Sequence, residues 1–240
     1  MPFVLTRRSS GGVSVAPYDR LNLATHVGDD PIAVSANRAE LHHALLGSGV
    51  QRMIWMSQVH GDAVAVIERD ILDSVSHDER ASVVALDVDG LVTAERGIGL
   101  VVLVADCVPL VLLDESRGVT GAVHVGRRGL ASGVAMNAVA EMRELGATSI
   151  AATLGPSICA RCYEVPAEMR NEVERSAPGS AAVTRQGTPS IDLAAGLTAQ
   201  LASLGVLADV DPRCTAEDPD LYSHRRDGVT GRFAAIVWSE

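Results

Sequence analysis

The sequence holds 240 residues, of which 47% are hydrophobic and 21% charged, so a disordered chain is excluded and a domain with a substantial core is expected. The formal net charge of −10 disfavours general nucleic-acid binding, because counterion release from phosphates needs a basic surface. All 20 basic residues are arginine, which excludes lysine Schiff-base chemistry and a Walker-type phosphate loop.

The first half of the chain reads as one helix followed by a series of strands. Helical spacing predicts a helix over 37–47, and short β-type runs predict strands over 53–56 and 63–67. Longer runs rich in Val and Leu predict buried strands over 83–92, 100–105, 110–113 and 121–125, with a hairpin turn at 114–118. Pro109 cannot donate to a ladder, so we expect the strand to end or bulge there.

The second half alternates between helices and strands. An amphipathic helix is predicted over 130–145, a strand over 150–154, and helices over 167–175 and 193–204, the last with Asp192 as a possible cap. A terminal strand is predicted over 233–238. Strands in the middle with helices on either side favour a mixed α/β or α+β fold, and no linker or repeat divides residues 1–240, so we expect a single domain.

Compartment signals point to a cytoplasmic protein without a membrane partner. Residues 1–8 lack the apolar stretch of a secretory signal. The longest apolar run, 98–113, is interrupted by Asp106 and Pro109 and is too short to span a bilayer. Four cysteines in a chain of this length do not form a disulfide scaffold, so a reduced environment is expected.

Polar residues interrupt or end three of the predicted strands. Asp106 and Cys107 lie inside an apolar run, His124 ends the next strand before a glycine-rich helix entry, and His60 follows an earlier strand beside a glycine. A thiolate with two imidazoles suits zinc and leaves a fourth position for water or substrate. A Cys/His nucleophilic pair would use the same residues without metal, and the spacing leaves both readings open.

Each of these residues also has an ordinary explanation when taken alone. Cys107 can be a small buried hydrophobe, although the neighbouring Asp106 argues against it, since burying an unpaired carboxylate is costly. His60 and His124 can be loop or strand-end histidines. Arg127 and Arg128 precede a predicted helix, where an anion such as phosphate would be favoured.

Two further segments carry weaker signals. Cys159 and Cys162 form a single CxxC, a weak indication of redox chemistry or structural zinc, and we expect both to have a packing role. Cys214 has no partner nearby in sequence and is also interpreted as structural. The arginines and glycines of 222–232 fit a solvated loop or an anion clamp.

Several ordered motifs together resemble one family. They are LNLATHVGDDP (21–31), SQVHGD (57–62), DGLVT (89–93), ADCVPLVLLD (105–114), HVGRRGL (124–130), LGPSICARCYEV (154–165) and YSHRRDGVTGR (222–232). The sequence is similar over nearly its whole length to the YfiH family, also called the polyphenol oxidase or laccase-domain family. Arg127 stands where most members have a tryptophan.

The resemblance implies a fold and a metal. The fold would be one α/β domain with two mixed sheets between helical layers, similar to the cytotoxic necrotizing factor-like cysteine-hydrolase fold. The metal would be zinc, bound by His60, Cys107 and His124, and copper is the alternative because it outcompetes zinc on intrinsic affinity.

The resemblance also implies an activity: phosphorolysis of adenosine, inosine or methylthioadenosine to free base and ribose 1-phosphate, with adenosine deamination in the same repertoire. Asp106 is then a candidate for proton handling or ligand orientation, and Arg128 for phosphate binding. Asn22, Arg38 and Gln58 are candidates for nucleoside contacts. The sequence does not predict the oligomeric state.

Three other functions stay open. One is an amidase-like hydrolase that edits peptidoglycan precursors, with Cys107 as nucleophile or zinc-assisted chemistry, and it would need no phosphate. Another is copper-dependent phenol oxidation, which the absence of His-x-His pairs among the 7 histidines disfavours as the main role. The last is a non-catalytic binding protein, which a three-ligand site disfavours because structural zinc has four protein ligands.

Overall fold

The computed structural model describes residues 3–68 and 83–240. In this part of the chain, one sheet has the strand order β1-β13-β6-β2-β4. Its strands are β1 (Phe3–Leu5), β13 (Phe233–Val237), β6 (Ile98–Val104), β2 (Arg52–Ser57) and β4 (Val83–Asp87). β13 is antiparallel to both β1 and β6, whereas β2 is parallel to both β6 and β4, so the sheet is mixed.

A second mixed sheet has the order β12-β9-β7-β8-β5-β3. Its strands are β12 (Ala208–Val210), β9 (Ala151–Leu154), β7 (Val108–Asp114), β8 (Val119–Val125), β5 (Gly90–Thr93) and β3 (Val64–Val66). The outer pairs β12–β9 and β3–β5 are parallel, and the pairs between them are antiparallel. A separate two-stranded ribbon is formed by β10 (Ala181–Val183) and β11 (Pro189–Ile191).

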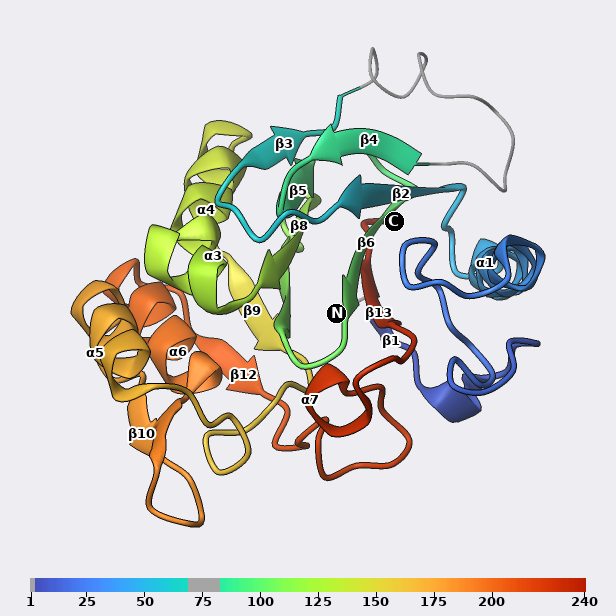
Figure 1. The fold of residues 1–240 in the computed structure, drawn as a ribbon. Coiled ribbons are helices and arrows are strands. Elements are labelled where there is room, and N and C mark those ends of the chain that lie inside the picture. Colours follow the sequence, from blue (N-terminus) through green and yellow to red (C-terminus); the bar gives the residue numbers. More distant parts are fainter. Residues whose placement is uncertain (1–2, 69–82) are drawn as a thin grey trace.

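Helices cover the outer faces of the two sheets (Figure 1). α1 (Pro31–Leu46) lies on the side of the first sheet, and the helices on the side of the second are α3 (Arg127–Ser132), α4 (Val134–Glu144), α5 (Ala167–Ser176) and α6 (Leu193–Ser203). Two short elements, η1 (Arg8–Ser10) and α7 (His224–Asp227), lie in loops. No helix in the described ranges is long and apolar enough to cross a membrane.

The central strands β2, β6 and β13 of the first sheet are buried on both faces. In β2, Ile54 packs in the cluster between the two sheets, whereas Trp55 packs in the cluster toward α1. In β6, Val102 likewise packs between the two sheets, and Val101 packs toward α1. This alternation explains the continuous apolar run of β6, because strands covered on both faces need no polar side. The two predicted mixed sheets between helical layers are confirmed.

Two predicted elements are each divided in the structure. The strand expected over 83–92 is two strands: β4 belongs to the first sheet and β5 to the second, and the chain crosses between the sheets at Val88 and Asp89. The helix expected over 130–145 is two helices, α3 and α4, separated by Gly133 with a left-handed φ of 84°. The crossing between the sheets divides the predicted strand, and the left-handed Gly133 divides the predicted helix. The pattern of hydrophobic residues alone marks neither division.

The expected strand end or bulge at Pro109 was wrong. Pro109 is the second residue of β7 and lies opposite His124, and pairing with β9 begins only at Leu110, so the missing N–H falls at the start of the strand. The hairpin turn at 114–118 and the Asp192 cap of α6 are confirmed. The short elements β1, β10, β11, β12 and α7 carry too few residues for a periodic signal.

Candidate metal centre and substrate cavity

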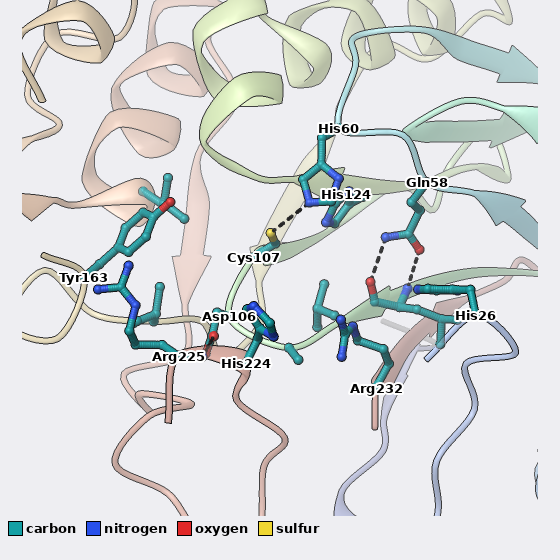
Figure 2. A pocket seen from close by; sticks show the side chains of 15 residues that line it. His26, Gln58, His60, Asp106, Cys107, His124, Tyr163, His224, Arg225 and Arg232 are labelled. Carbon is teal, nitrogen blue, oxygen red and sulfur yellow. Dashed lines mark hydrogen bonds between the residues drawn. The ribbon is translucent and has the colours of Figure 1, made fainter. Parts of the chain in front are cut away.

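Two connections between strands and the end of a third strand place His60, Cys107 and His124 together (Figure 2). His60 follows β2, Cys107 lies between β6 and β7, and His124 lies near the end of β8. The Cys107 Sγ is 3.9 Å from the His60 Nε2, and the two imidazole rings meet edge to face with centroids 4.7 Å apart. One donor atom from each residue lies within 4.8 Å of the others. The predicted trio is therefore brought together.

A buried carboxylate, Asp89, fixes both histidines. Its Oδ1 accepts hydrogen bonds from the His124 Nδ1 at 2.7 Å and from the His60 backbone N–H at 2.9 Å, and its Oδ2 accepts from the Gly61 N–H at 2.6 Å. These bonds hold His60 in a left-handed conformation, with φ 61°. Since the carboxylate can only accept, the His124 Nδ1 carries the proton, and its Nε2 is the atom available to a metal.

Glycines allow the chain after β8 to pass close to the cluster. A Cβ at Gly126 would lie 3.0 Å from the His60 Cδ2 and 3.1 Å from the Cys107 Sγ, and a Cβ at Gly129 would lie 3.1 Å from the Gly61 carbonyl oxygen. A larger residue at Gly126 would press on the His60 ring and the Cys107 sulfur, and one at Gly129 would press on the backbone next to His60. The glycines of the motif at 124–130 thus allow the backbone to lie close to His60 and Cys107.

The trio forms a coupled ionic cluster. Burial raises the pKa of the Cys107 thiol, but the His124 and His60 imidazoles outweigh it and lower that pKa to about 6. Burial lowers the pKa of His124, whereas the Cys107 thiolate and the Asp89 carboxylate raise it to about 9. Without metal, Cys107 and His124 thus form a thiolate–imidazolium pair at neutral pH, and a metal ion would bind the thiolate and displace the proton of the His124 Nε2. Two imidazoles and one thiolate fit zinc with an open fourth position.

A cavity of about 400 Å³ opens beside this trio (Figure 2). Its size is within the range of small-molecule sites, roughly 300–1,000 Å³. The polar and aromatic residues that line it beyond the trio are His26, Gln58, Asp106, Tyr163, His224, Arg225 and Arg232, and the apolar ones include Leu103, Val104, Ile158 and Leu193.

The cavity combines positive charge with an aromatic surface. The Arg225 guanidinium lies 5.1 Å from the centre of the Tyr163 ring. Burial lowers the pKa of Arg232, but a guanidinium stays charged at neutral pH. Burial and the nearby Arg232 also lower the pKa of His26. Arginines in a partly desolvated cavity favour an anion, and guanidinium geometry suits both phosphate and carboxylate groups.

Two of the predicted substrate or proton-handling residues line this cavity. The Gln58 side chain is held at the end of β6, where its Nε2 donates to the Leu103 carbonyl at 2.7 Å and its Oε1 accepts from the same residue's N–H at 2.9 Å. The Asp106 carboxylate accepts from the Ser223 hydroxyl at 2.6 Å and from the Arg225 N–H at 2.7 Å. Asp106 thereby positions the segment that carries Arg225, and its role in proton handling stays a prediction.

The other three predicted substrate residues lie outside the cavity lining. Asn22 is fully buried, and its Oδ1 accepts from the Arg232 N–H at 2.9 Å, so it holds that residue's backbone. Arg38 is buried with its guanidinium 3.9 Å from the centre of the Trp55 ring. Arg128 is exposed at the start of α3. Substrate contact by these three residues stays a prediction.

Sequence reasoning missed Asp89, Arg232 and Tyr163 as site residues. All three lie in the quoted motifs at 89–93, 154–165 and 222–232, but motif membership alone does not say which side chain faces the cavity. A usable signal existed for Asp89, because a carboxylate between two apolar runs needs buried partners.

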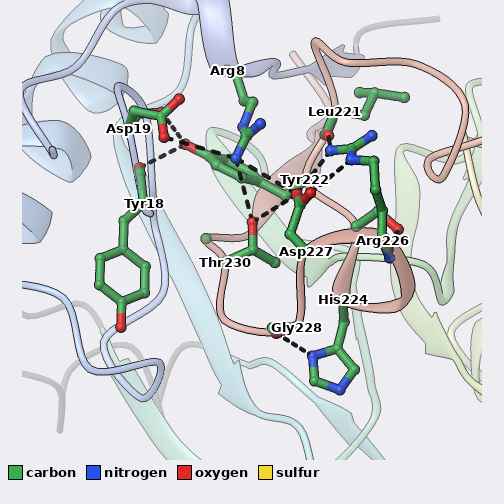
Figure 3. A network of polar contacts seen from close by, with 12 residues as sticks. Arg8, Tyr18, Asp19, Leu221, Tyr222, His224, Arg226, Asp227, Gly228 and Thr230 are labelled. Carbon is green, nitrogen blue, oxygen red and sulfur yellow. Dashed lines mark hydrogen bonds and ion pairs between the residues drawn. The ribbon is translucent and has the colours of Figure 1, made fainter. Parts of the chain in front are cut away.

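A polar network rigidifies the segment 222–232 (Figure 3). The buried Tyr222 hydroxyl donates to the Asp19 carbonyl at 2.9 Å, and the Arg8 guanidinium lies 4.7 Å from the Tyr222 ring centre. Arg226 pairs with Asp227 at 2.8 Å and donates to three backbone carbonyls. His224 and Arg225 are thus presented to the cavity by a braced, exposed loop, and anion binding by this segment stays a prediction.

Comparisons with known proteins agree with this description. Residues 3–240 match the family described as multi-copper polyphenol oxidoreductase laccase. The chain is 49% identical over 239 residues to a purine nucleoside phosphorylase of Mycobacterium tuberculosis, covering 98% of this chain and 91% of that protein. It is 50% identical over 231 residues to a purine nucleoside phosphorylase of Streptomyces coelicolor, with 95% and 91% covered.

A solved structure shares the fold over the same length. The structure of YlmD from Geobacillus stearothermophilus superposes with a TM-score of 0.84 at 34% identity, covering 99% of this chain and 92% of that one. The sequence match and this superposition each span almost the whole chain, and the resemblance read from the motifs is confirmed. The chain belongs to the multi-copper polyphenol oxidoreductase laccase family.

Proposed function

We propose that this protein is a zinc-dependent purine nucleoside phosphorylase that acts on adenosine, inosine and methylthioadenosine. The observation that carries the proposal is that a three-donor cluster and two arginines, Arg225 and Arg232, face one cavity. The names of the relatives from Mycobacterium tuberculosis and Streptomyces coelicolor support the reaction class.

His60, Cys107 and His124 would hold the zinc ion, oriented by Asp89. When bound, zinc supplies Lewis-acid chemistry at its open coordination position. Among the described residues that line the cavity, no other group could hold a metal ion in this way. The lining residues around the trio would therefore define which molecules reach the open position.

The remaining cavity residues would bind the two substrates. Arg225 and Arg232 would orient phosphate, which attacks the ribose carbon as positive charge builds on the sugar. The Tyr163 ring, beside Arg225, offers a flat surface for the purine. The His224 Nδ1 donates to the Gly228 carbonyl at 2.6 Å, so the Nε2 is the ring nitrogen left for the substrate, and His224 in its imidazolium form would give the Nε2 proton to the departing purine.

Adenosine deamination is a second candidate activity of the same site. The observation that favours it is the donor set of one thiolate and two imidazoles, because zinc deaminases use Cys and His ligands with one open position to hydrolyse an exocyclic amine. Deamination consumes water and releases ammonia, whereas phosphorolysis consumes phosphate, so the two activities separate by co-substrate.

The proposal is tested by product analysis of zinc-loaded protein with adenosine, in buffer with and without phosphate. We expect adenine and ribose 1-phosphate only with phosphate, and inosine as a minor product in either buffer. His60→Ala should abolish both activities, and His43→Ala, at an exposed position of α1, should retain them. Adenine without phosphate would indicate a hydrolase, and the absence of any product from zinc-loaded protein would overturn the nucleoside function.

A further inference from the structure

A second group of metal-binding side chains lies apart from the cavity trio. Cys159, Cys162, Cys214 and Glu217 each offer one donor atom, and the four atoms all lie within 4.8 Å of one another. The sequence predicted only packing roles for the cysteines, because the CxxC had no second pair. The fold supplies the missing partners from a segment more than 50 residues away.

Two local turns bring the four side chains together. In the first turn, the N–H of Cys162 donates to the Cys159 carbonyl at 2.9 Å, so both thiols project to one side. In the second turn, the Glu217 N–H donates to the Cys214 carbonyl at 3.0 Å, and these side chains share a face for the same reason. Ser157 and Cys214 form a bridge that joins the two segments.

The spacing of the donor atoms fits a tetrahedral ion. The Glu217 Oε1 lies 3.3 Å from the Cys162 Sγ and 3.9 Å from the Cys159 Sγ. In a tetrahedral zinc site with Zn–S of about 2.3 Å and Zn–O of about 2.0 Å, sulfur and oxygen are about 3.5 Å apart. The Cys159 N–H also donates to the Cys214 Sγ at 3.3 Å, a bond that favours a thiolate sulfur.

Nearby arginines would balance the charge of a filled site. Three thiolates, one carboxylate and a divalent ion sum to a charge of about −2. Arg185 and Arg161 pair with the Glu217 carboxylate at 2.6 Å and 3.6 Å. Two guanidiniums at the rim thus neutralise the excess.

We propose that Cys159, Cys162, Cys214 and Glu217 form a second, structural zinc site. Four protein ligands close the coordination sphere, as in structural sites, whereas the trio at the cavity leaves one position open. Metal binding would release the thiol protons and cross-link the two segments. The first segment carries Ile158 and Tyr163, which line the cavity, so this ion would brace one cavity wall.

The test uses the Cys107→Ala variant, which removes one ligand of the first site and leaves these three cysteines as the only thiols of the chain. Metal-free variant is titrated with Co²⁺ and followed by absorption. We expect one tightly bound Co²⁺ per chain, with an intense near-ultraviolet thiolate-to-cobalt band and visible bands of a tetrahedral ion. All thiolate absorption must then come from Cys159, Cys162 and Cys214.

Two comparisons make the result specific. Cys159→Ser in the Cys107→Ala background should lose the bound Co²⁺ and its thiolate band, while Glu172→Gln, at an exposed position of α5, should retain both. Zinc should raise the melting temperature of the Cys107→Ala protein but not of the double variant.

Counting the zinc ions bound to wild type gives a test that does not depend on whether a variant folds. Wild type purified with its metal should contain two zinc ions per chain, and Cys107→Ala one. The proposal is overturned if wild type binds one ion and Cys107→Ala binds none, or if Cys107→Ala has a single free thiol, that of Cys214, because Cys159 and Cys162 are joined by a disulfide.

Discussion

The Asp89 carboxylate lies 2.7 Å from the His124 Nδ1 while also accepting the backbone N–H groups of residues 59–61. One side chain therefore fixes the orientation of His124 and the position of His60. Asp89 lies at the crossing between the two sheets, so the fold and the metal centre depend on the same residue.

Asp89→Asn should weaken metal binding at the cavity trio. Loss of such an outer partner costs about 10- to 100-fold in metal affinity, because the ligand loses its fixed tautomer and orientation. Competition with a chelator measures the affinity, in a Cys159→Ser background so that only the cavity trio is counted. Asp87→Asn is the matched control, since Asp87 is exposed and accepts only from the Ser57 hydroxyl at 3.0 Å in the described contacts. Equal affinities in the two variants would contradict the role of Asp89.

Gly126→Ala should also weaken metal binding, by a steric route. Gly126 has an ordinary φ of −85°, so alanine is tolerated by the backbone, but its Cβ would press on His60 and Cys107. We expect a folded protein, judged by circular dichroism, with reduced metal affinity. Gly47→Ala is the control, because a Cβ there meets nothing within 4 Å. Unchanged affinity in Gly126→Ala would show that the close approach is unimportant.

Arg232→Ala and Arg128→Ala distinguish a cavity arginine from the phosphate ligand expected from the sequence. Arg232 lines the cavity, whereas Arg128 is exposed outside its lining. Loss of a charge-assisted hydrogen bond costs about 1.5–3 kcal/mol, which corresponds to about a 10- to 100-fold rise in the KM for phosphate. We expect this rise for Arg232→Ala and little change for Arg128→Ala, measured by initial rates at varied phosphate. The reverse pattern would restore Arg128 as the phosphate ligand.

Asp114 is expected to stabilise the fold in a pH-dependent way. It is fully buried and accepts hydrogen bonds from the Ser116 hydroxyl at 2.6 Å and from the N–H groups of Thr148 and Ser149 at 2.6 and 2.7 Å. Burial raises its pKa, but these bonds outweigh it and hold the pKa well below the usual range. The charged form thus contributes stability above the unfolded pKa of about 3.9, and this contribution is lost as pH falls toward the folded pKa.

Asp114→Asn should lower the free energy of unfolding by about 2 kcal/mol at pH 7, and the difference from wild type should shrink below about pH 4. Urea denaturation at several pH values measures it. Glu115→Gln, at the exposed neighbouring position, should have little effect at any pH. A constant difference between Asp114→Asn and wild type down to pH 3 would show that the charge of Asp114 is not responsible.

The chemistry of the trio could be predicted from sequence, but its surroundings could not. His60, Cys107 and His124 each interrupt or end an apolar strand, which is a local signal. Arg232 and Arg128 both lie in glycine-rich, arginine-rich motifs, and only the packing of the C-terminal segment decides which one faces the cavity. The periodicity of hydrophobic residues carries no information about such long-range packing.

The same limit applies to the second cysteine group and to the strand breaks. Cys214 meets Cys159 through the bridge between Ser157 and Cys214 and through the hydrogen bond from the Cys159 N–H to the Cys214 Sγ, and no local pattern encodes these long-range contacts. The chain crosses between the sheets at Asp89, which lies between two short apolar runs, and the predicted strand over 83–92 joined these two runs into one. Gly133 was readable as a helix breaker, but a single glycine is tolerated in many helices.

The most direct test of the nucleoside function at this site is phosphorus NMR of wild-type and Cys107→Ala protein mixed with adenosine and inorganic phosphate. We expect a growing ribose 1-phosphate resonance at the expense of phosphate with wild type, and no such resonance with Cys107→Ala at equal protein concentration. Equal ribose 1-phosphate formation by both proteins, or none with zinc-loaded wild type, would contradict the nucleoside function at this site.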